Sequence, residues 1–188
     1  MDNPSAPPAR ANLPARPNWN MRYRWMTLAD VPQVHAIDQL SFSLPWPERS
    51  YQFELTQNEN SILWVAEALP DQPGVPPRIS GMIVVWLVVD EAHVATVAVH
   101  PDFRGQGLSK KLLALGLRSA MLRGAVESTL EVRASNVVAQ KLYAQFDYHV
   151  VGQRPRYYKD NNEDALLMTV KGMGPAYLHW LDTMLVDV

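Results

Sequence analysis

The sequence predicts one mixed α/β domain in which helices flank a twisted, mostly antiparallel sheet. The run from Val94 to Leu115 changes from a β-branched strand to helical spacing across a glycine-rich turn. Segments 62–67 and 79–89 are apolar runs separated by a loop rich in proline and glycine, which is typical of an antiparallel pair. Segments 148–153 and 164–170 predict a second pair that closes the sheet.

The chain has 188 residues, which suits one ordinary domain with some additional sequence. Residues 1–20 are rich in proline, alanine and asparagine and lack periodicity, so we expect a disordered tail there. Residues 21–171 form the predicted domain. Residues 172–188 predict a C-terminal amphipathic helix, for which packing on its own domain is the simpler interpretation and binding to a partner the alternative.

Composition excludes several classes of protein. The absence of cysteine removes disulfides, thiolate metal sites and a covalent acyl-cysteine route. A formal net charge of −2 gives no support to nucleic-acid binding. No stretch approaches the ~18 uninterrupted apolar residues of a membrane span, and the N-terminus lacks a hydrophobic signal core. We therefore expect a cytoplasmic protein that binds neither nucleic acid nor membranes.

The N-terminal part of the domain predicts one strand and two helices. The strand covers residues 23–26, and Asp30 is placed to cap the first helix, in whose first turn Pro32 is tolerated. The second helix covers residues 48–57. The apolar side of the first helix is formed by Val34, Ile37 and Leu40.

The loop between these two helices carries two aromatic side chains. Phe42 is interpreted as packing on the core, as apolar loop residues commonly do. Trp46 lies between two prolines, so we expect a rigid, partly exposed ring that contributes to a recognition pocket.

The central run supplies the strand and helix around which the sheet is organised. His100 and Pro101 end the strand, because proline cannot donate to a sheet ladder. The following helix runs to about Gly124, with leucines at helical spacing on its core side. A further strand over residues 128–132 leads into a helix that Ser135 or Asn136 caps, on which Asn136 and Tyr143 are expected to share one face.

A glycine-rich loop joins the central strand to its helix. Gly105 and Gly107 let backbone N–H groups approach a ligand closely, and the first turn of the helix adds unpaired donors and a positive dipole end. These features predict a phosphate site. Arg104, Lys110 and Lys111 add positive charge, which suits a ligand with several phosphates. A simple tight turn is the alternative, but the order of strand, arginine, glycines and helix favours the phosphate site.

The loop resembles the acetyl-coenzyme A loop of the GNAT superfamily of N-acetyltransferases. The superfamily signature is Gln/Arg-x-x-Gly-x-Gly/Ala, and it stands here as Arg104-x-x-Gly107-x-Ser109. Serine in the last place departs from the signature, although it is small and retains its N–H. Acetyl transfer to an amine requires a neutral amine, a polarised thioester and protonation of the departing thiolate.

Two residues beyond the loop suit this chemistry by type and position. Glu131 lies at the end of the strand over residues 128–132, which neighbours the strand that leads into the glycine loop, here called the coenzyme strand. A base is needed at this place, although a glutamate on a strand is more often a solvated charge. Tyr143 has a hydroxyl able to protonate a thiolate, because the reference pKa of tyrosine, about 10, lies above that of a thiol near 8.5. Taken alone, a helix tyrosine is more often a core residue.

Several further motifs resemble those of the RimI group of GNAT enzymes, which acetylates the N-terminal alanine of a ribosomal protein. The similarity extends from about Tyr23 to Val170 and rests on segments 131–136, 142–143, 42–46 and 156–165. One departure is Asp147-Tyr148, where the group has Gly-Phe, so Asp147 is expected to adopt the left-handed conformation.

The resemblance implies a fold, a cosubstrate and a role for each site residue. The sheet would separate between the parallel strands at Val94 and Ser128, with acetyl-CoA in the gap and no metal. Glu131 would be the general base and Tyr143 the general acid of a direct transfer in a ternary complex. The coenzyme would be contacted by Val97, Ala98, Val99, Arg104, Gly105, Gln106, Gly107, Leu108, Ser109, Lys110 and Asn136. A peptide N-terminus, such as that of a ribosomal protein, would be received by Phe42, Trp46, Tyr157 and Tyr158.

Two alternatives remain open at this point. The first is a GNAT enzyme that acts on lysine or on a small amine. The second is a non-catalytic acyl-coenzyme sensor or scaffold, against which the presence of both Glu131 and Tyr143 counts. The five histidines show no metal-ligand spacing, and core or surface roles are the simpler interpretation for His93 and His100, which bracket the coenzyme strand.

Overall fold

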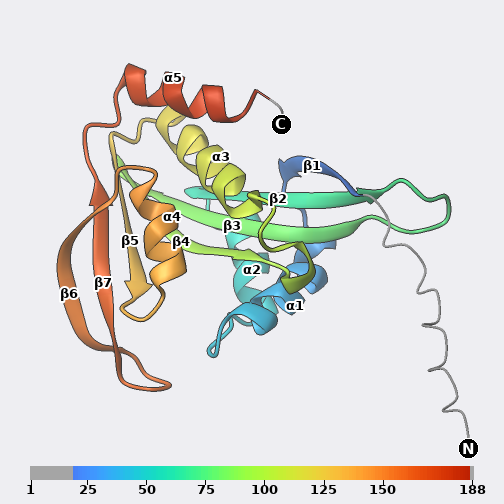
Figure 1. Ribbon diagram of the computed structural model, residues 1–188, viewed down its shortest axis with the longest axis horizontal. Coiled ribbons are helices and arrows are strands. Elements are labelled where there is room, and N and C mark those ends of the chain that lie inside the picture. The colour runs from blue at the N-terminus through green and yellow to red at the C-terminus, as the bar shows by residue number, and fades with distance from the viewer. Residues whose placement is uncertain (1–18, 187–188) are drawn as a thin grey trace, which may run out of the picture.

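The computed structural model describes residues 19–186, so nearly all of the predicted tail over residues 1–20 lies outside the described residues. The strands are β1 (Trp19–Trp25), β2 (Ser61–Pro70), β3 (Arg78–Val88), β4 (Glu91–Val99), β5 (Glu127–Arg133), β6 (His149–Tyr158) and β7 (Glu163–Val170). The helices are α1 (Val31–Ser41), α2 (Glu48–Thr56), α3 (Leu108–Leu122), α4 (Val137–Ala144) and α5 (Pro175–Met184). The strands form one sheet, with α3 and α5 over one face and α1 and α2 over the other (Figure 1).

The sheet separates in its middle. Its strand order is β1-β2-β3-β4-β5-β7-β6, and every neighbouring pair except β4 and β5 is antiparallel. These two strands are parallel and pair only at Glu91, Ala92 and His93 of β4. Beyond His93 they diverge (Figure 1), which confirms the predicted mixed α/β fold with separated parallel strands.

An irregularity in β4 lies just beyond the point of separation. Val94 pairs with Val85 and Thr96 with Val84, so Ala95 has no partner on β3. A residue inserted in this way is a β-bulge, which bends a strand and increases its local twist. The bulge therefore turns the last residues of β4 away from β5 and helps to open the gap.

Each face of the sheet has its own hydrophobic core. The larger core lies under α3 and α5 and includes the fully buried leucines of α3. The second lies under α1 and α2, where Val34, Ile37 and Tyr51 are buried. Helix α3 packs very closely on the sheet, because a Cβ added at Gly116 would lie 2.9 Å from Val85 Cγ2.

The N-terminal elements differ from the prediction in two respects. Strand β1 begins at Trp19 rather than Tyr23, because it pairs with β2 along its whole length, from Trp19 with Pro70 to Trp25 with Trp64. The predicted apolar side of α1 ends at Ile37, since Leu40 is 55% exposed. Helix α1 does begin after Asp30, but the Asp30 carboxylate accepts hydrogen bonds from Thr27 and Arg24 instead of from the helix.

The C-terminal helix packs on its own domain, as the simpler interpretation predicts. Leu181 is fully buried, and Trp180 contacts the Phe146 ring edge to face at 5.4 Å. The Tyr177 hydroxyl donates to the Phe146 carbonyl at 2.8 Å, which ties α5 to the end of α4. Within the described part of the chain, no helix combines the length and apolar character needed to cross a bilayer.

Candidate active site

The glycine loop has the backbone that the sequence predicts. Gly105 and Gly107 both have φ of +78°, a conformation that residues with a side chain rarely adopt. A Cβ added at either position would meet no described atom within 4 Å, so the loop presents open backbone to solvent. Gly107 directly precedes α3, whose first N–H groups have no intrahelical acceptors. The loop therefore offers the close approach and the donors that a phosphate group requires.

Side chains around this loop divide into those that hold it and those that face solvent. The Arg104 guanidinium donates to the Val99 carbonyl at 3.0 Å and to Ser41 Oγ at 3.3 Å, although the residue is exposed. Leu108 is 3% exposed and belongs to the larger core, so only its backbone faces the loop. Gln106 and Lys110 are exposed, whereas Ser109 is half-buried.

The separated edge of β4 leads from this loop into the sheet. Val97, Ala98 and Val99 pair with β3 on one side, but β5 has already diverged on the other. Their backbone groups on the β5 side therefore have no strand partner among the described residues. Asn136 lies at the start of α4, where its Oδ1 accepts from the Ala139 N–H at 3.1 Å. This capping contact commits the amide oxygen and leaves the NH₂ group for a ligand.

Glu131 faces the gap on the α1–α2 side of the sheet. Its neighbours Leu130 and Val132 are buried in the core under α3, so alternation along β5 directs the Glu131 side chain to the opposite face. That side chain is 11% exposed, and Arg154 Nη2 lies 3.0 Å from its Oε1. His93 Nε2 lies 3.5 Å from the other oxygen, Oε2. Glu131 is therefore a largely buried, paired carboxylate and not a solvated surface charge.

Tyr143 approaches from the other face of the sheet. It lies in the larger core with Leu130, and its ring centroid is 5.9 Å from that of Tyr148. Burial raises the pKa of Tyr143 well above its usual range, so the hydroxyl stays protonated at any physiological pH. Asn136, which was expected to share a helix face with Tyr143, is instead exposed and precedes α4. Glu131 and Tyr143 thus lie on opposite faces of the sheet.

A stack of aromatic rings crosses the α1–α2 face and ends at His93. Trp46 packs against Tyr51 and stacks on Trp86 at 5.8 Å, and Trp86 stacks on His93 at 5.5 Å. The expectation that Phe42 packs on the core is therefore wrong, whereas Trp46 is partly exposed, as expected. Trp46 is half-buried against the second core, whereas Phe42 is 39% exposed and does not pack in the core.

Arg133 ties together the two loops that were predicted to receive a peptide. Its guanidinium pairs with Asp160 at 2.8 Å and Glu163 at 3.1 Å, and it donates to Ser43 Oγ at 3.0 Å. Ser43 also hydrogen-bonds to Asp160. The Arg133 guanidinium lies 3.9 Å from the Tyr158 ring centroid. The loop after α1 and the hairpin between β6 and β7 are therefore joined beside Glu131.

The remaining predicted residue of this group, Tyr157, stands at the edge of the site. It is 41% exposed and contacts Tyr158 edge to face at 5.3 Å. The guanidinium of Arg154, the partner of Glu131, lies 5.6 Å from the Tyr157 ring centroid.

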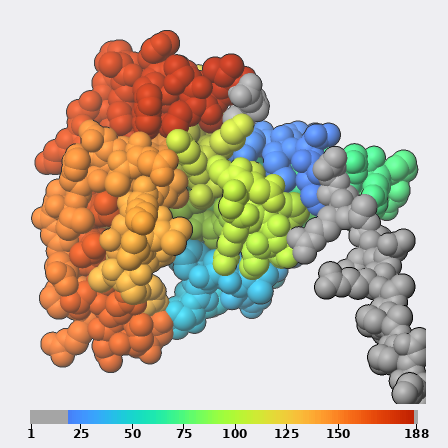
Figure 2. Space-filling model, viewed as in Figure 1, coloured from blue at the N-terminus to red at the C-terminus, as the bar shows by residue number. Residues whose placement is uncertain are grey.

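In the space-filling view the loop before α3, helix α4 and the segment around α1 and α2 meet on one face (Figure 2).

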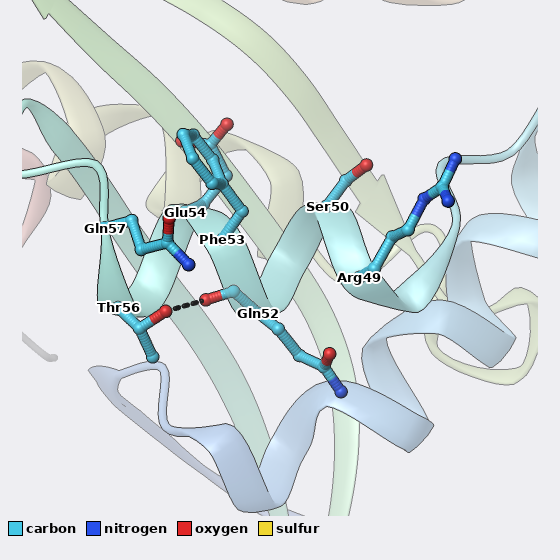
Figure 3. Close-up of a pocket in the computed structure, with 7 residues that line it drawn as sticks. All are labelled: Arg49, Ser50, Gln52, Phe53, Glu54, Thr56 and Gln57. Atoms are coloured by element: carbon cyan, nitrogen blue, oxygen red, sulfur yellow. Dashed lines mark hydrogen bonds between the residues drawn. The ribbon is translucent and has the colours of Figure 1, made fainter.

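A separate hollow lies along α2 (Figure 3). It is lined by Arg49, Ser50, Gln52, Phe53, Glu54, Thr56 and Gln57. None of these residues belongs to the predicted site. Among residues 19–186, no cluster of three or more histidines and carboxylates is placed to hold a metal ion.

Sequence reasoning missed His93, Arg133 and Arg154 as members of this site. His93 was assigned a core or surface role, although it brackets the coenzyme strand. Arg133 lies within the motif Glu131–Asn136, where its charge beside a candidate base was the available signal. Arg154 had no comparable signal, because its contact with Glu131 depends on how β6 and β5 flank β7.

Comparisons with known proteins identify relatives of the chain. The profile described as the Acetyltransferase (GNAT) family matches residues 31–148. A Bacillus subtilis relative, provisionally named as a ribosomal protein bS18-alanine N-acetyltransferase, is 35% identical over 147 residues, covering 78% of this chain and 93% of that protein. The Escherichia coli (strain K12) ribosomal protein bS18-alanine N-acetyltransferase is 30% identical over 152 residues, covering 75% of this chain and 90% of that protein.

Solved structures show the same architecture. The crystal structure of the Escherichia coli ribosomal-protein-S18-alanine N-acetyltransferase matches with a TM-score of 0.69 and 28% identity, covering 81% of this chain and 94% of that chain. Arabidopsis thaliana NAA60 in complex with acetyl-CoA matches with a TM-score of 0.72, covering 82% of this chain and 100% of that chain. At 17% identity, this second similarity concerns the fold alone.

Proposed function

The chain belongs to the GNAT acetyltransferase family, and we propose that it transfers the acetyl group of acetyl-CoA to the N-terminal α-amino group of a protein. One observation carries the proposal. Glu131 and Tyr143 lie on opposite faces of the sheet, and Glu131 faces His93 where β4 and β5 separate. A base and an acid on opposite sides of a thioester are what direct acetyl transfer requires.

The residues present fit acetyl-CoA. Open backbone at Gly105 and Gly107 suits the pyrophosphate, and the exposed side chain of Lys110 adds positive charge. The edge of β4 at Val97–Val99, which has no neighbouring strand on the β5 side, suits the amide groups of the pantetheine arm, which pair with backbone as a strand does. When bound, the coenzyme supplies an activated acetyl group. Arg104 would act by fixing the loop against β4 and not by contacting phosphate.

Glu131 serves as the base in this proposal. An α-amine has an ordinary pKa of about 7.7 to 8.0, so part of it is already neutral near pH 7 and a modest base suffices for the rest. Glu131 removes the proton directly or through one water, and the neutral amine then attacks the acetyl carbon. Arg154 and His93 hold the carboxylate in place for this step.

Tyr143 serves as the hydrogen donor to the departing sulfur. Its raised pKa means that complete proton transfer to a thiolate is uphill by about 1.4 kcal/mol for each unit of difference. We therefore propose that Tyr143 acts mainly by donating a hydrogen bond to the developing negative charge, as oxyanion-type donors do. The raised pKa favours this role, because the hydroxyl never ionises under working conditions.

The acceptor is proposed to enter between the loop after α1 and the hairpin between β6 and β7. Phe42 and Tyr157 are exposed there, while Trp46 and Tyr158 shape the walls from half-buried positions. The names of the Bacillus subtilis and Escherichia coli relatives support a ribosomal protein that begins with alanine as the acceptor. Such a substrate also supports a cytoplasmic site of action.

The test uses acetyl-CoA and peptides that begin with Ala, Ser or Met. Each is compared with a version that is blocked at its N-terminus and contains lysine, and mass spectrometry locates the acetyl group. Acetylation confined to free N-termini is the expected result. Acetylation of lysine alone would overturn the proposed acceptor in favour of a lysine-directed enzyme, and coenzyme binding without turnover on any amine would indicate a sensor.

A further inference from the structure

His93 occupies the point at which the two parallel strands separate. It is the last residue of β4 that pairs with β5, and its partner there is Thr129. Its Nε2 lies 3.5 Å from Glu131 Oε2, and the two side chains are 22% and 11% exposed. An imidazole and a carboxylate therefore face each other, largely removed from solvent, at the deepest point of the gap.

The plane of the His93 ring is held by its neighbours. The imidazole stacks on the indole of Trp86, with 14° between the planes. Trp86 is itself fixed, because its Nε1 donates to Glu54 Oε2 at 3.0 Å and its other face stacks on Trp46. Glu54 accepts further hydrogen bonds from Asn58 and Ser61. Such a supported ring is oriented in advance toward Glu131.

The charged groups around His93 define what it can do. Glu131 on β5 faces it directly, Arg154 on β6 holds the other oxygen of Glu131, and Glu54 on α2 lies behind Trp86. In general a carboxylate, with a pKa of about 4.3, is a poor match for a proton that leaves an α-ammonium group of about 7.7 to 8.0. An imidazole, at about 6.5, is a closer match, and proton transfer is most efficient when the pKa values are near each other.

We propose that His93 is a positioning residue that orients Glu131 and takes up the proton which Glu131 removes from the acceptor amine. The proposal rests on the proposed function. The ammonium N–H bond breaks and its proton passes through Glu131 Oε2 to Nε2 of His93. The amine lone pair forms the bond to the acetyl carbon, and the attached nitrogen gives up its second proton to solvent. The carbon–sulfur bond breaks while Tyr143 donates a hydrogen bond to the sulfur, and the released thiolate takes its proton from solvent. The His93 imidazolium then returns its proton to solvent.

The test compares pH profiles of kcat/KM for peptide acetylation. His93→Gln keeps a polar group beside Glu131, and His93→Phe keeps the stack on Trp86. His149→Gln is the matched control, because His149 is 75% exposed and pairs only with Asp147 among the described residues. We expect kcat/KM at pH 7 to fall by about tenfold or more in both His93 variants. The wild-type profile should show two steps in which kcat/KM falls toward acidic pH, here called acidic limbs, and both variants should lose one of them. The remaining limb belongs to the substrate amine, and the control keeps both limbs.

Two results would overturn the proposal. Wild-type kcat/KM in either His93 variant would do so, as would a uniform decrease in both variants with both limbs retained, because a purely structural residue lowers activity equally at every pH. If neither variant folds, NMR titration of the His93 ring in the full wild-type chain replaces the kinetics. The titration must change in Glu131→Gln, and an unchanged His93 titration would contradict the coupling.

Failure of this inference is distinguishable from failure of the proposed function. If the wild-type enzyme acetylates a lysine or a small amine instead of an N-terminus, the acceptor proposal fails. The pH profiles of kcat/KM for wild type and the His93 variants are then measured with that amine as substrate. The NMR titration requires no substrate. The coupling between His93 and Glu131 is therefore tested independently of the identity of the acceptor.

Discussion

Replacement of Gly107 by alanine separates the cost to folding from the cost to coenzyme binding. Gly107 has φ of +78°, so an alanine there must adopt the left-handed region, at a cost of about 1–2 kcal/mol in the free energy of unfolding. Because the added Cβ would meet no described atom within 4 Å, no steric term is added. For a chain of this size we expect a decrease in Tm of about 2–8 °C.

Coenzyme binding should suffer more than stability. The space beyond Gly107 is where the pyrophosphate is proposed to approach the backbone, so the methyl group should weaken acetyl-CoA binding by about tenfold or more, which is about 1.4 kcal/mol. Isothermal titration calorimetry measures this affinity, and differential scanning calorimetry measures Tm on the same samples.

Gly74 provides the matched control. It has φ of +85°, its added Cβ would also meet nothing within 4 Å, and it lies in the loop between β2 and β3, outside the proposed site. Gly74→Ala should show a similar decrease in Tm and wild-type affinity for acetyl-CoA. Equal affinities in wild type, Gly107→Ala and Gly74→Ala would refute the placement of the phosphate site at this loop.

Four further outcomes follow from contacts described above. Glu131→Gln should lower kcat for peptide acetylation by about 10²-fold or more while acetyl-CoA affinity stays within about twofold; full turnover would remove Glu131 from the mechanism. Asp147→Gly should raise the free energy of unfolding by up to about 1 kcal/mol in urea titrations, because Asp147 has φ of +62° and its pair with His149 is exposed; a clear loss of stability would show that the aspartate is needed. Gly116→Ala should destabilise by about 1–3 kcal/mol despite a gain of about 1 kcal/mol in helix propensity, since its Cβ would collide with Val85, and an increase in Tm would contradict this close packing. The Arg24 hydrogen bond holds the pKa of Glu67 below its usual range against the effect of burial, so the stabilising contribution of Glu67 is present above about pH 4.5 and is lost as the pH falls through the folded-state pKa. In urea titrations from pH 7 to pH 3, the free energy of unfolding should decrease less for Glu67→Gln than for wild type. The same decrease in both proteins would exclude Glu67 as a source of the acid sensitivity.

Local sequence predicted the parts of the site that depend on neighbouring residues. The glycine loop follows from residues 104–109 alone, because backbone conformation and helix termination are local properties. The left-handed conformation of Asp147 was expected from the resemblance, because the similar group has glycine in that place, and it is observed at φ of +62°. The positions of Glu131 and Tyr143 on opposite faces required the alternation along β5 and the packing of α4.

Contacts between distant segments were not predictable in this way. Arg133 joins Ser43 and Asp160, which are separated from it by 90 and 27 residues. The unexpected exposure of Phe42 has the same origin. Which ring is buried depends on Trp86 of β3, which offers a flat surface to Trp46 and not to Phe42. A single sequence carries no signal for such a surface.

The brief pairing of β4 with β5 divides the sheet into two leaves, one containing β1 to β4 and the other β5 to β7. Only three backbone pairs form the seam between them, and the larger core, which contains side chains of both leaves and of α3, also joins them. A coenzyme bound as proposed, along the unpaired edge of β4 and against the start of α4, would add hydrogen bonds and contacts between the two leaves. Coenzyme binding would then stabilise the contact between the two leaves. A bound coenzyme should therefore slow amide hydrogen exchange in both leaves together, including strands that it does not touch.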